Sequence, residues 1–118
     1  MIIRKESLVA KKAFGFALAI IAITRILPKT YENIILIRQI IRSATSIGAN
    51  IEEALGGNSR KEFIHSMNIA KKEARETRYW LSLIMELNKI EVERMQAVLS
   101  QCDELINILT KIVKTSSL

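Results

Sequence analysis

The sequence has 118 residues, of which 49% are hydrophobic, and a formal net charge of +6. A chain of this length is one domain (residues 1–118) by the usual size range, and its apolar content excludes an intrinsically disordered protein. One proline and four glycines leave little to interrupt helices, and a single cysteine cannot form an internal disulfide, which favours a reducing compartment such as the cytoplasm.

The first predicted helix spans residues 5–27 and ends before Pro28, whose ring cannot continue a helix. Its apolar residues are spaced alternately by four and three: Val9, Ala13, Phe16, Ile20, Ile23 and Leu27. A membrane helix needs about 20 consecutive apolar residues. The run from Ala13 to Ile23 is shorter and is closed by Arg25, so we expect no membrane segment and no targeting peptide.

This helix also has a second apolar face, formed by Phe14, Leu18 and Ile21. A helix in a monomeric bundle needs only one apolar stripe, and large exposed apolar patches are rare on soluble monomers. We therefore expect Phe14, Leu18 and Ile21 to form an interface between identical subunits. The alternative is a helix wedged deeply into the core of a monomer.

The second predicted helix spans residues 31–55, and its heptad stripe is Ile34, Ile37, Ile41, Ala44, Gly48, Ile51 and Leu55. It should end at Gly56-Gly57, where glycine readily adopts a left-handed cap. Polar residues recur beside the apolar stripe, and Arg42 is expected to face Glu73 across the turn. We interpret this stripe as a structural polar network that sets helix register, rather than as a ligand site; its members are Gln39, Arg42, Ser46, Asn50, Glu53 and Glu73.

The third predicted helix spans residues 60–87 and begins with a capping box formed by Ser59 and Glu62. Its apolar stripe is Phe63, Met67, Ala70, Ala74, Thr77, Leu81 and Ile84. Basic side chains recur along the same helix and could contact phosphates. Together with two lysines of the first helix, the candidate nucleic-acid-binding residues are Lys11, Lys12, Lys71, Lys72, Arg75 and Arg78.

Two features favour an ordinary solvated face on the third helix instead. Glu73 and Glu76 interleave with the basic residues, as in ion-paired helix surfaces. No aromatic platform is predicted, because Tyr79 and Trp80 are the only aromatic residues nearby and Trp80 flanks the core stripe.

The fourth predicted helix spans residues 91–115, and Asn88 and Glu91 give it a start similar to the capping box of the third helix but weaker. Its stripe is Val92, Met95, Leu99, Cys102, Ile106, Leu109 and Val113, which places Cys102 in the core as a small hydrophobic residue. The alternating spacings and short connections predict an all-α fold, an antiparallel up-and-down left-handed four-helix bundle.

Two spacings on the third helix are typical of enzymes. Glu62-x-x-His65 is half of a di-iron ligand set, but the second half is missing because His65 is the only histidine. Arg60 and His65 have the Arg-x4-His spacing of HEPN ribonucleases. We expect neither a metal nor another cofactor, and no catalytic residues, since Ser/His/Asp sets, CxxC pairs and phosphate-binding glycine loops are missing from the sequence.

The central motif is similar to that of the 23S rRNA intervening-sequence protein family, which includes the accessory protein of diversity-generating retroelements. The residues that carry the resemblance are Gln39, Arg42, Ser43, Ala44, Ser46, Ile47, Ala49, Asn50, Ile51, Glu52, Glu53, Arg60, Glu62, Phe63, Ile69 and Ala70. Two positions depart from the family pattern, Gly48 and the turn at Ala54-Leu55-Gly56. The resemblance implies a four-helix bundle assembled into a ring, typically a pentamer, without known catalysis. For some members it implies binding to nucleic acid or to a reverse transcriptase.

Charge is distributed unevenly along the sequence. Residues 1–50 carry eight basic and two acidic residues, whereas residues 51–118 carry ten of each. A basic half favours an anionic partner. We therefore expect a non-enzymatic homo-oligomeric scaffold whose basic surface binds RNA, DNA or a protein that handles them. The alternatives are a HEPN-like ribonuclease using Arg60 and His65, or a purely structural assembly subunit.

Overall fold

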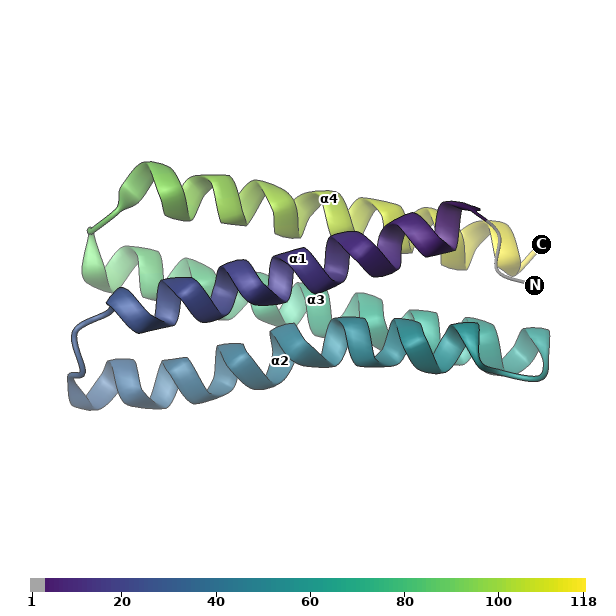
Figure 1. The fold of residues 1–118 in the computed structure, drawn as a ribbon, viewed down its shortest axis with the longest axis horizontal. Helices are drawn as coiled ribbons and strands as arrows, with labels where there is room; N and C mark the ends of the chain where they lie inside the picture. The colour runs from purple at the N-terminus through teal and green to yellow at the C-terminus, as the bar shows by residue number, and fades with distance from the viewer. Residues whose placement is uncertain (1–3) are drawn as a thin grey trace.

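Four long helices lie side by side in the computed structural model, which describes residues 4–118 and the side chains of residues 8–118. They are α1 (Arg4–Ile26), α2 (Tyr31–Leu55), α3 (Arg60–Asn88) and α4 (Val92–Ser116). Consecutive helices run in opposite directions, and the start of α1 and the C-terminus lie at the end of the bundle that holds the α2–α3 turn (Figure 1). Each helix contacts two neighbours; in the described part of the chain α1 contacts α2 and α4 but not α3. The predicted all-α four-helix bundle is confirmed, and its left-handed sense stays a prediction.

The helix ends lie within one residue of the predicted bounds. The capping box is present: the Ser59 side chain accepts from the Glu62 N–H at 3.1 Å, and a Glu62 carboxylate oxygen accepts from the Asn58 N–H at 3.0 Å. The α2 start uses Thr30, whose hydroxyl accepts from the Asn33 N–H at 3.2 Å. Both caps satisfy backbone donors that the first helical turn leaves unpaired.

Two predicted helix ends were wrong in detail. No described glycine has a positive φ, so Gly56-Gly57 does not form a left-handed cap. Gly56 instead caps α2 with right-handed backbone angles, and its N–H donates to the Glu52 carbonyl oxygen at 3.1 Å. Asn88 does not start α4; the left-handed residues Lys89 and Glu91 make that turn, and Glu91 is the N-cap without a side-chain hydrogen bond.

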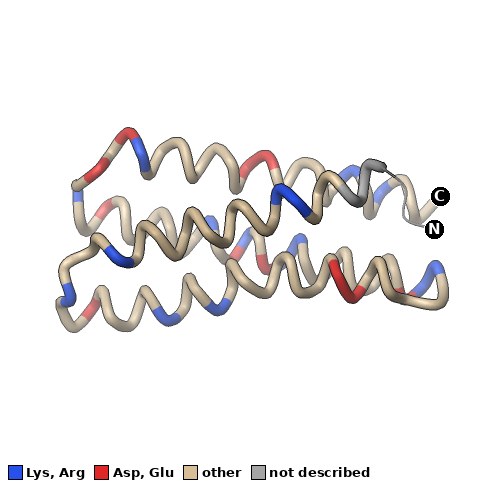
Figure 2. Tube along the Cα trace, viewed as in Figure 1, with Lys and Arg blue, Asp and Glu red and all other residues tan. Residues whose placement is uncertain are grey.

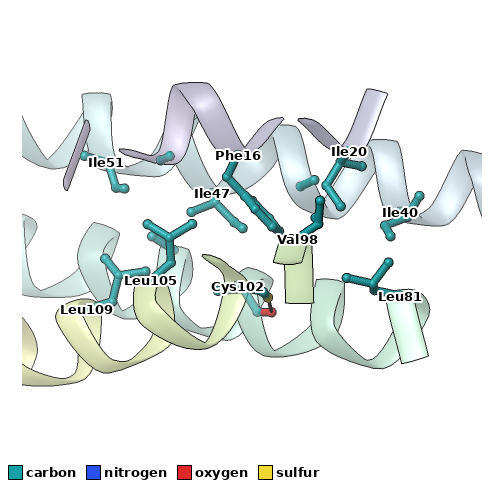
Figure 3. Close-up of a cluster of buried hydrophobic side chains, with 14 of the residues drawn as sticks. Phe16, Ile20, Ile40, Ile47, Ile51, Leu81, Val98, Cys102, Leu105 and Leu109 are labelled. Carbon is teal, nitrogen blue, oxygen red and sulfur yellow. Dashed lines mark hydrogen bonds between the residues drawn. The ribbon is translucent and has the colours of Figure 1, made fainter. Parts of the chain in front are cut away.

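The predicted core stripes of α1 and α3 are confirmed, except that Phe63 is only half-buried. Phe16 of α1 lies among Ile47 of α2 and Val98 and Cys102 of α4 in the centre of the core (Figure 3). The Cys102 thiol donates to the Ala74 carbonyl oxygen at 3.3 Å, and burial raises its pKa to about 12. The thiol is therefore protonated at neutral pH and unsuited to nucleophilic chemistry, as expected for a core cysteine.

The predicted stripes of α2 and α4 were wrong in phase over much of their length. The residues buried in α2 are Asn33, Leu36, Ile40, Ser43, Ala44, Ile47, Ile51 and Ala54, and those in α4 are Met95, Val98, Cys102, Leu105, Leu109 and Ile112. Predicted core residues Ile34 and Val92 are 41% and 48% exposed. In α2 most of the buried residues lie one position before the predicted ones. In α4 Met95, Cys102 and Leu109 are buried as predicted, and Val98, Leu105 and Ile112 are buried in place of Leu99, Ile106 and Val113. Hydrophobic spacing alone does not determine which of two adjacent apolar stripes is buried. The direction from which the neighbouring helices pack determines it.

None of the helices in the described range is long and apolar enough to cross a membrane.

Candidate nucleic-acid interface

Arg42 links α2 to α3 near the middle of the bundle. Its guanidinium lies 3.3 Å from the Glu73 carboxylate, the partner expected from the sequence, and also pairs with Glu76. The Arg42 side chain is 48% exposed, whereas those of Glu73 and Glu76 are 16% and 31% exposed. The indole N–H of Trp80 donates to Glu76 at 3.1 Å. These four side chains form one connected cluster on the surface of α2 and α3.

The rest of the predicted polar network does not connect the helices. The Ser46 hydroxyl and the Asn50 amide donate to carbonyl oxygens one turn earlier in α2, those of Arg42 and Ser46. No hydrogen bond joins the side chains of Gln39 and Glu53 to another described side chain. The buried polar contacts between helices lie elsewhere, and sequence reasoning missed them.

The first missed contact is Thr77–Ser43, a 2.8 Å hydrogen bond between α3 and α2 with both residues fully buried. The second is the pair Asn33–Asn88, whose side-chain amides exchange two hydrogen bonds of 2.7 and 3.1 Å. This pair lies at the end of α2 and α3 that is far from the turn between them. A polar residue within the apolar stripe of α3, Thr77, was the sequence signal that could have indicated the Thr77–Ser43 hydrogen bond. These neutral pairs satisfy buried polar groups and tie α2 to α3 at defined positions.

Replacing Arg42 by alanine should destabilise the protein by about 1 kcal/mol. The lost ion pairs are partly exposed and contribute little themselves, but two neighbouring carboxylates would lose their only basic partner in the described structure. Urea unfolding of Arg42→Ala measures the change. The matched control is Arg38→Ala, since Arg38 is exposed on the same helix and forms no ion pair with a described side chain. Equal stabilities of the two variants would show that Arg42 does not set the register of α2 and α3.

The six candidate nucleic-acid-binding residues do not form one surface on a single chain. Lys11 and Lys12 are exposed on α1, which lies diagonally opposite α3. Lys12 pairs with Glu104 at 3.3 Å, and Arg78 with Asp103 at 2.6 Å, a contact that raises the Arg78 pKa through the hydrogen bond and the carboxylate charge. The remaining three candidates are Lys71, Lys72 and Arg75 of α3, and Lys71 is half-buried.

Lys72 and Arg75 are the two candidates on α3 that are best placed to contact phosphates. Both are exposed on α3, and neither forms an ion pair with a described side chain. The two glutamates next to them in sequence are already engaged with Arg42. Their positive charges are therefore available to an anionic partner, whereas those of Lys12 and Arg78 are already balanced. The side chains of Arg4 and Lys5, which contribute to the basic half of the sequence, lie outside the described residues.

The predicted subunit interface lies on the outer side of α1 and α2. Phe14 and Leu18 are 69% and 55% exposed, and Ile21 is half-buried. Between Lys12 and Arg25, α1 carries no charged residue (Figure 2). These three side chains line an open, mainly apolar cavity of about 360 Å³ between α1 and α2. The other residues that line it are Ala10, Ala13, Ala17, Thr45, Gly48, Ala49 and Glu52.

Arg60 and His65 both lie exposed on α3. His65 lines an open cavity of about 770 Å³ at the α2–α3 turn together with Glu52, Glu53 and Glu62, and Arg60 is not among its lining residues. Within the described chain, no group of three or more His, Cys, Asp and Glu side chains could hold a metal ion.

Comparison with known proteins places this architecture in a family. The 23S rRNA-intervening sequence protein family matches residues 5–111. A crystal structure of a protein with unknown function from the S23 ribosomal protein family of Bacteroides thetaiotaomicron has 38% sequence identity and a TM-score of 0.85. The alignment covers 93% of this chain and 98% of that one. No curated protein matched the sequence.

Proposed function

This chain belongs to the 23S rRNA-intervening sequence protein family, and from that premise we propose that it is a non-enzymatic, ring-forming scaffold that binds nucleic acid. The ring would contain five copies, the number that the family resemblance implies, and would act in the cytoplasm. The observation that carries the proposal is that one small bundle exposes both an apolar surface and a basic surface. The apolar surface lies on α1 and α2, and the basic surface lies on α3.

The apolar surface supports self-assembly. Phe14 and Leu18 would each remove apolar area from water on contact with a neighbour, at about 25 cal/mol per Å². Gly48 adds a second argument. A Cβ at Gly48 would approach only the Ala13 Cβ, at an ordinary 3.8 Å, so packing within the chain does not require glycine. A glycine in a helix interior lowers stability by about 0.5–1 kcal/mol relative to alanine. Space for a neighbouring subunit explains its presence.

The basic surface supports an anionic partner. The net charge is +6, and Lys72 and Arg75 are not balanced by acidic side chains in the described structure. The family is named for an intervening sequence of 23S rRNA, which points to RNA as the first candidate. A ring would repeat these two side chains once per subunit. Several weak phosphate contacts would then act together, and their combined affinity would exceed that of one subunit.

The absence of a catalytic set among the described residues supports a binding role. His65 is the only histidine, and Arg60 is not one of the residues that line its cavity. A protein partner such as a reverse transcriptase would use the same charged surface in place of free nucleic acid. A purely structural subunit would need the apolar surface alone.

The test combines light scattering with fluorescence anisotropy, using labelled RNA and DNA oligonucleotides over a series of salt concentrations. We expect an oligomer whose logarithmic affinity falls linearly with the logarithm of salt concentration, and no cleavage of RNA. A monomer would contradict the assembly proposal. An oligomer that binds neither RNA nor DNA would contradict the nucleic-acid proposal and favour the protein-partner or structural alternatives. RNA cleavage that His65→Ala abolishes would favour the ribonuclease alternative.

A further inference from the structure

The exposed ridge of α3 carries positive charge along one line. Side chains that recur every three or four residues share one face of a helix. The exposed members are Lys61, His65, Asn68, Lys72, Arg75 and Tyr79; we call them the α3 ridge. From Lys61 to Tyr79 the ridge extends about 27 Å at 1.5 Å per residue. None of its members is acidic.

Tyr79 is at the end of this ridge, one turn beyond Arg75, and its side chain is 58% exposed. The sequence predicted no aromatic platform beside the basic residues, and the structure shows that the Tyr79 ring is exposed one turn beyond Arg75. Residues three and four apart on a helix have Cβ atoms about 5–6 Å from each other. Lys72, Arg75 and Tyr79 therefore follow one another at a spacing that a nucleic-acid backbone and its bases can match.

The ring of Tyr79 is held in place by a chain of contacts. It packs against Trp80 in an edge arrangement, with ring centroids 5.2 Å apart and an interplanar angle of 66°. The Trp80 indole donates to Glu76, which pairs with Arg42. An aromatic ring that is already ordered loses less conformational entropy when a ligand stacks on it. These contacts link the Tyr79 ring through Trp80 and Glu76 to Arg42.

Resting on the proposed function, we infer that the α3 ridge binds single-stranded nucleic acid, with Tyr79 stacking on an unpaired base and Lys72 and Arg75 contacting phosphates. Basic side chains beside an exposed aromatic ring are typical of single-strand binding, since every base has a π-face. A duplex buries its base faces in its own stack, and it would leave Tyr79 without a partner. The stacking contact applies to both RNA and DNA, and a comparison of oligouridine with oligothymidine distinguishes them.

The experiment measures anisotropy of labelled oligouridine, oligothymidine and a duplex of equal length on the full-length oligomer. We expect the single strands to bind more tightly than the duplex. Tyr79→Ala should weaken single-strand binding about 5- to 150-fold and leave duplex binding unchanged. Tyr79→Phe should retain single-strand affinity because its ring remains. The matched control is Tyr31→Ala, which removes a tyrosine that is 81% exposed on another helix and should have no effect.

A second readout does not depend on affinity. Trp80 is the only tryptophan and touches Tyr79, so single strands should change its emission in the parent and not in Tyr79→Ala. Tight binding to Tyr79→Ala, equal affinities for single strand and duplex, or loss of the oligomer in Tyr79→Ala would each overturn the inference. In those three cases the parent still binds nucleic acid. Failure of the parent to bind any of the three probes would instead contradict the proposed function.

Discussion

Replacing Leu18 by glutamate is expected to convert the proposed oligomer into a folded monomer and to weaken nucleic-acid binding at least about 100-fold. Leu18 is 55% exposed and lines the apolar cavity between α1 and α2. A carboxylate there would be buried by a neighbouring subunit without a partner, which is strongly unfavourable. In the isolated chain the same carboxylate stays in water, so folding should survive. The loss of affinity follows because linked sites exceed single-site affinity by factors of about 10²–10⁴.

The control for this variant is Leu87→Glu. Leu87 is 57% exposed, nearly the same as Leu18, but lies near the end of α3 and not at the cavity. Light scattering should give an oligomer for Leu87→Glu and a monomer for Leu18→Glu, with equal helicity by circular dichroism. If Leu18→Glu remains assembled, the apolar surface of α1 and α2 is not the subunit interface. If it is monomeric and binds RNA like the parent, avidity does not contribute.

Phe16→Ala should have the largest effect on stability, a loss of about 3–5 kcal/mol. The Phe16 side chain is 1% exposed and lies in the centre of the core, where α1, α2 and α4 meet (Figure 3). Its removal leaves a cavity that long, regularly packed helices cannot close by local movement. Since domains are typically stable by about 5–15 kcal/mol, the variant should melt at least about 10 °C lower or fail to fold.

The comparison is with Phe14→Ala, two residues earlier on the same helix, where the side chain is 69% exposed. Both substitutions are made in the Leu18→Glu background, so that assembly does not contribute to the measured stability. In that monomer, Phe14→Ala should change the free energy of unfolding by less than about 0.5 kcal/mol. Similar losses for the two variants would mean that Phe14 belongs to the core and not to an interface.

The sequence predicted the positions of the helices because those signals are local. Pro28 prevents continuation of α1, and the Ser59 cap satisfies donors at the start of α3 whatever surrounds them. Short connections then require consecutive helices to pack side by side. The Arg42–Glu73 contact was predictable for the same reason, since both residues lie at similar distances from one tight turn.

Only the tertiary structure decided which apolar stripe of α2 and α4 is buried. Ile34 and Leu36 are equally hydrophobic choices in sequence, yet Ile34 is exposed and Leu36 is in the core. The choice depends on the directions from which two neighbouring helices approach, and these are set by all four helices together.

The candidate site was also partly predictable from the sequence and partly decided by the tertiary structure. Sequence spacing placed Lys71, Lys72, Arg75 and Arg78 on one helix. It could not show that Arg78 is balanced by Asp103 of α4, which contacts it from a distant part of the chain. It also could not show that Tyr79 is exposed beside Arg75. Helical periodicity determines which residues share a face, but whether that face is covered or open is determined by the packing of the other helices.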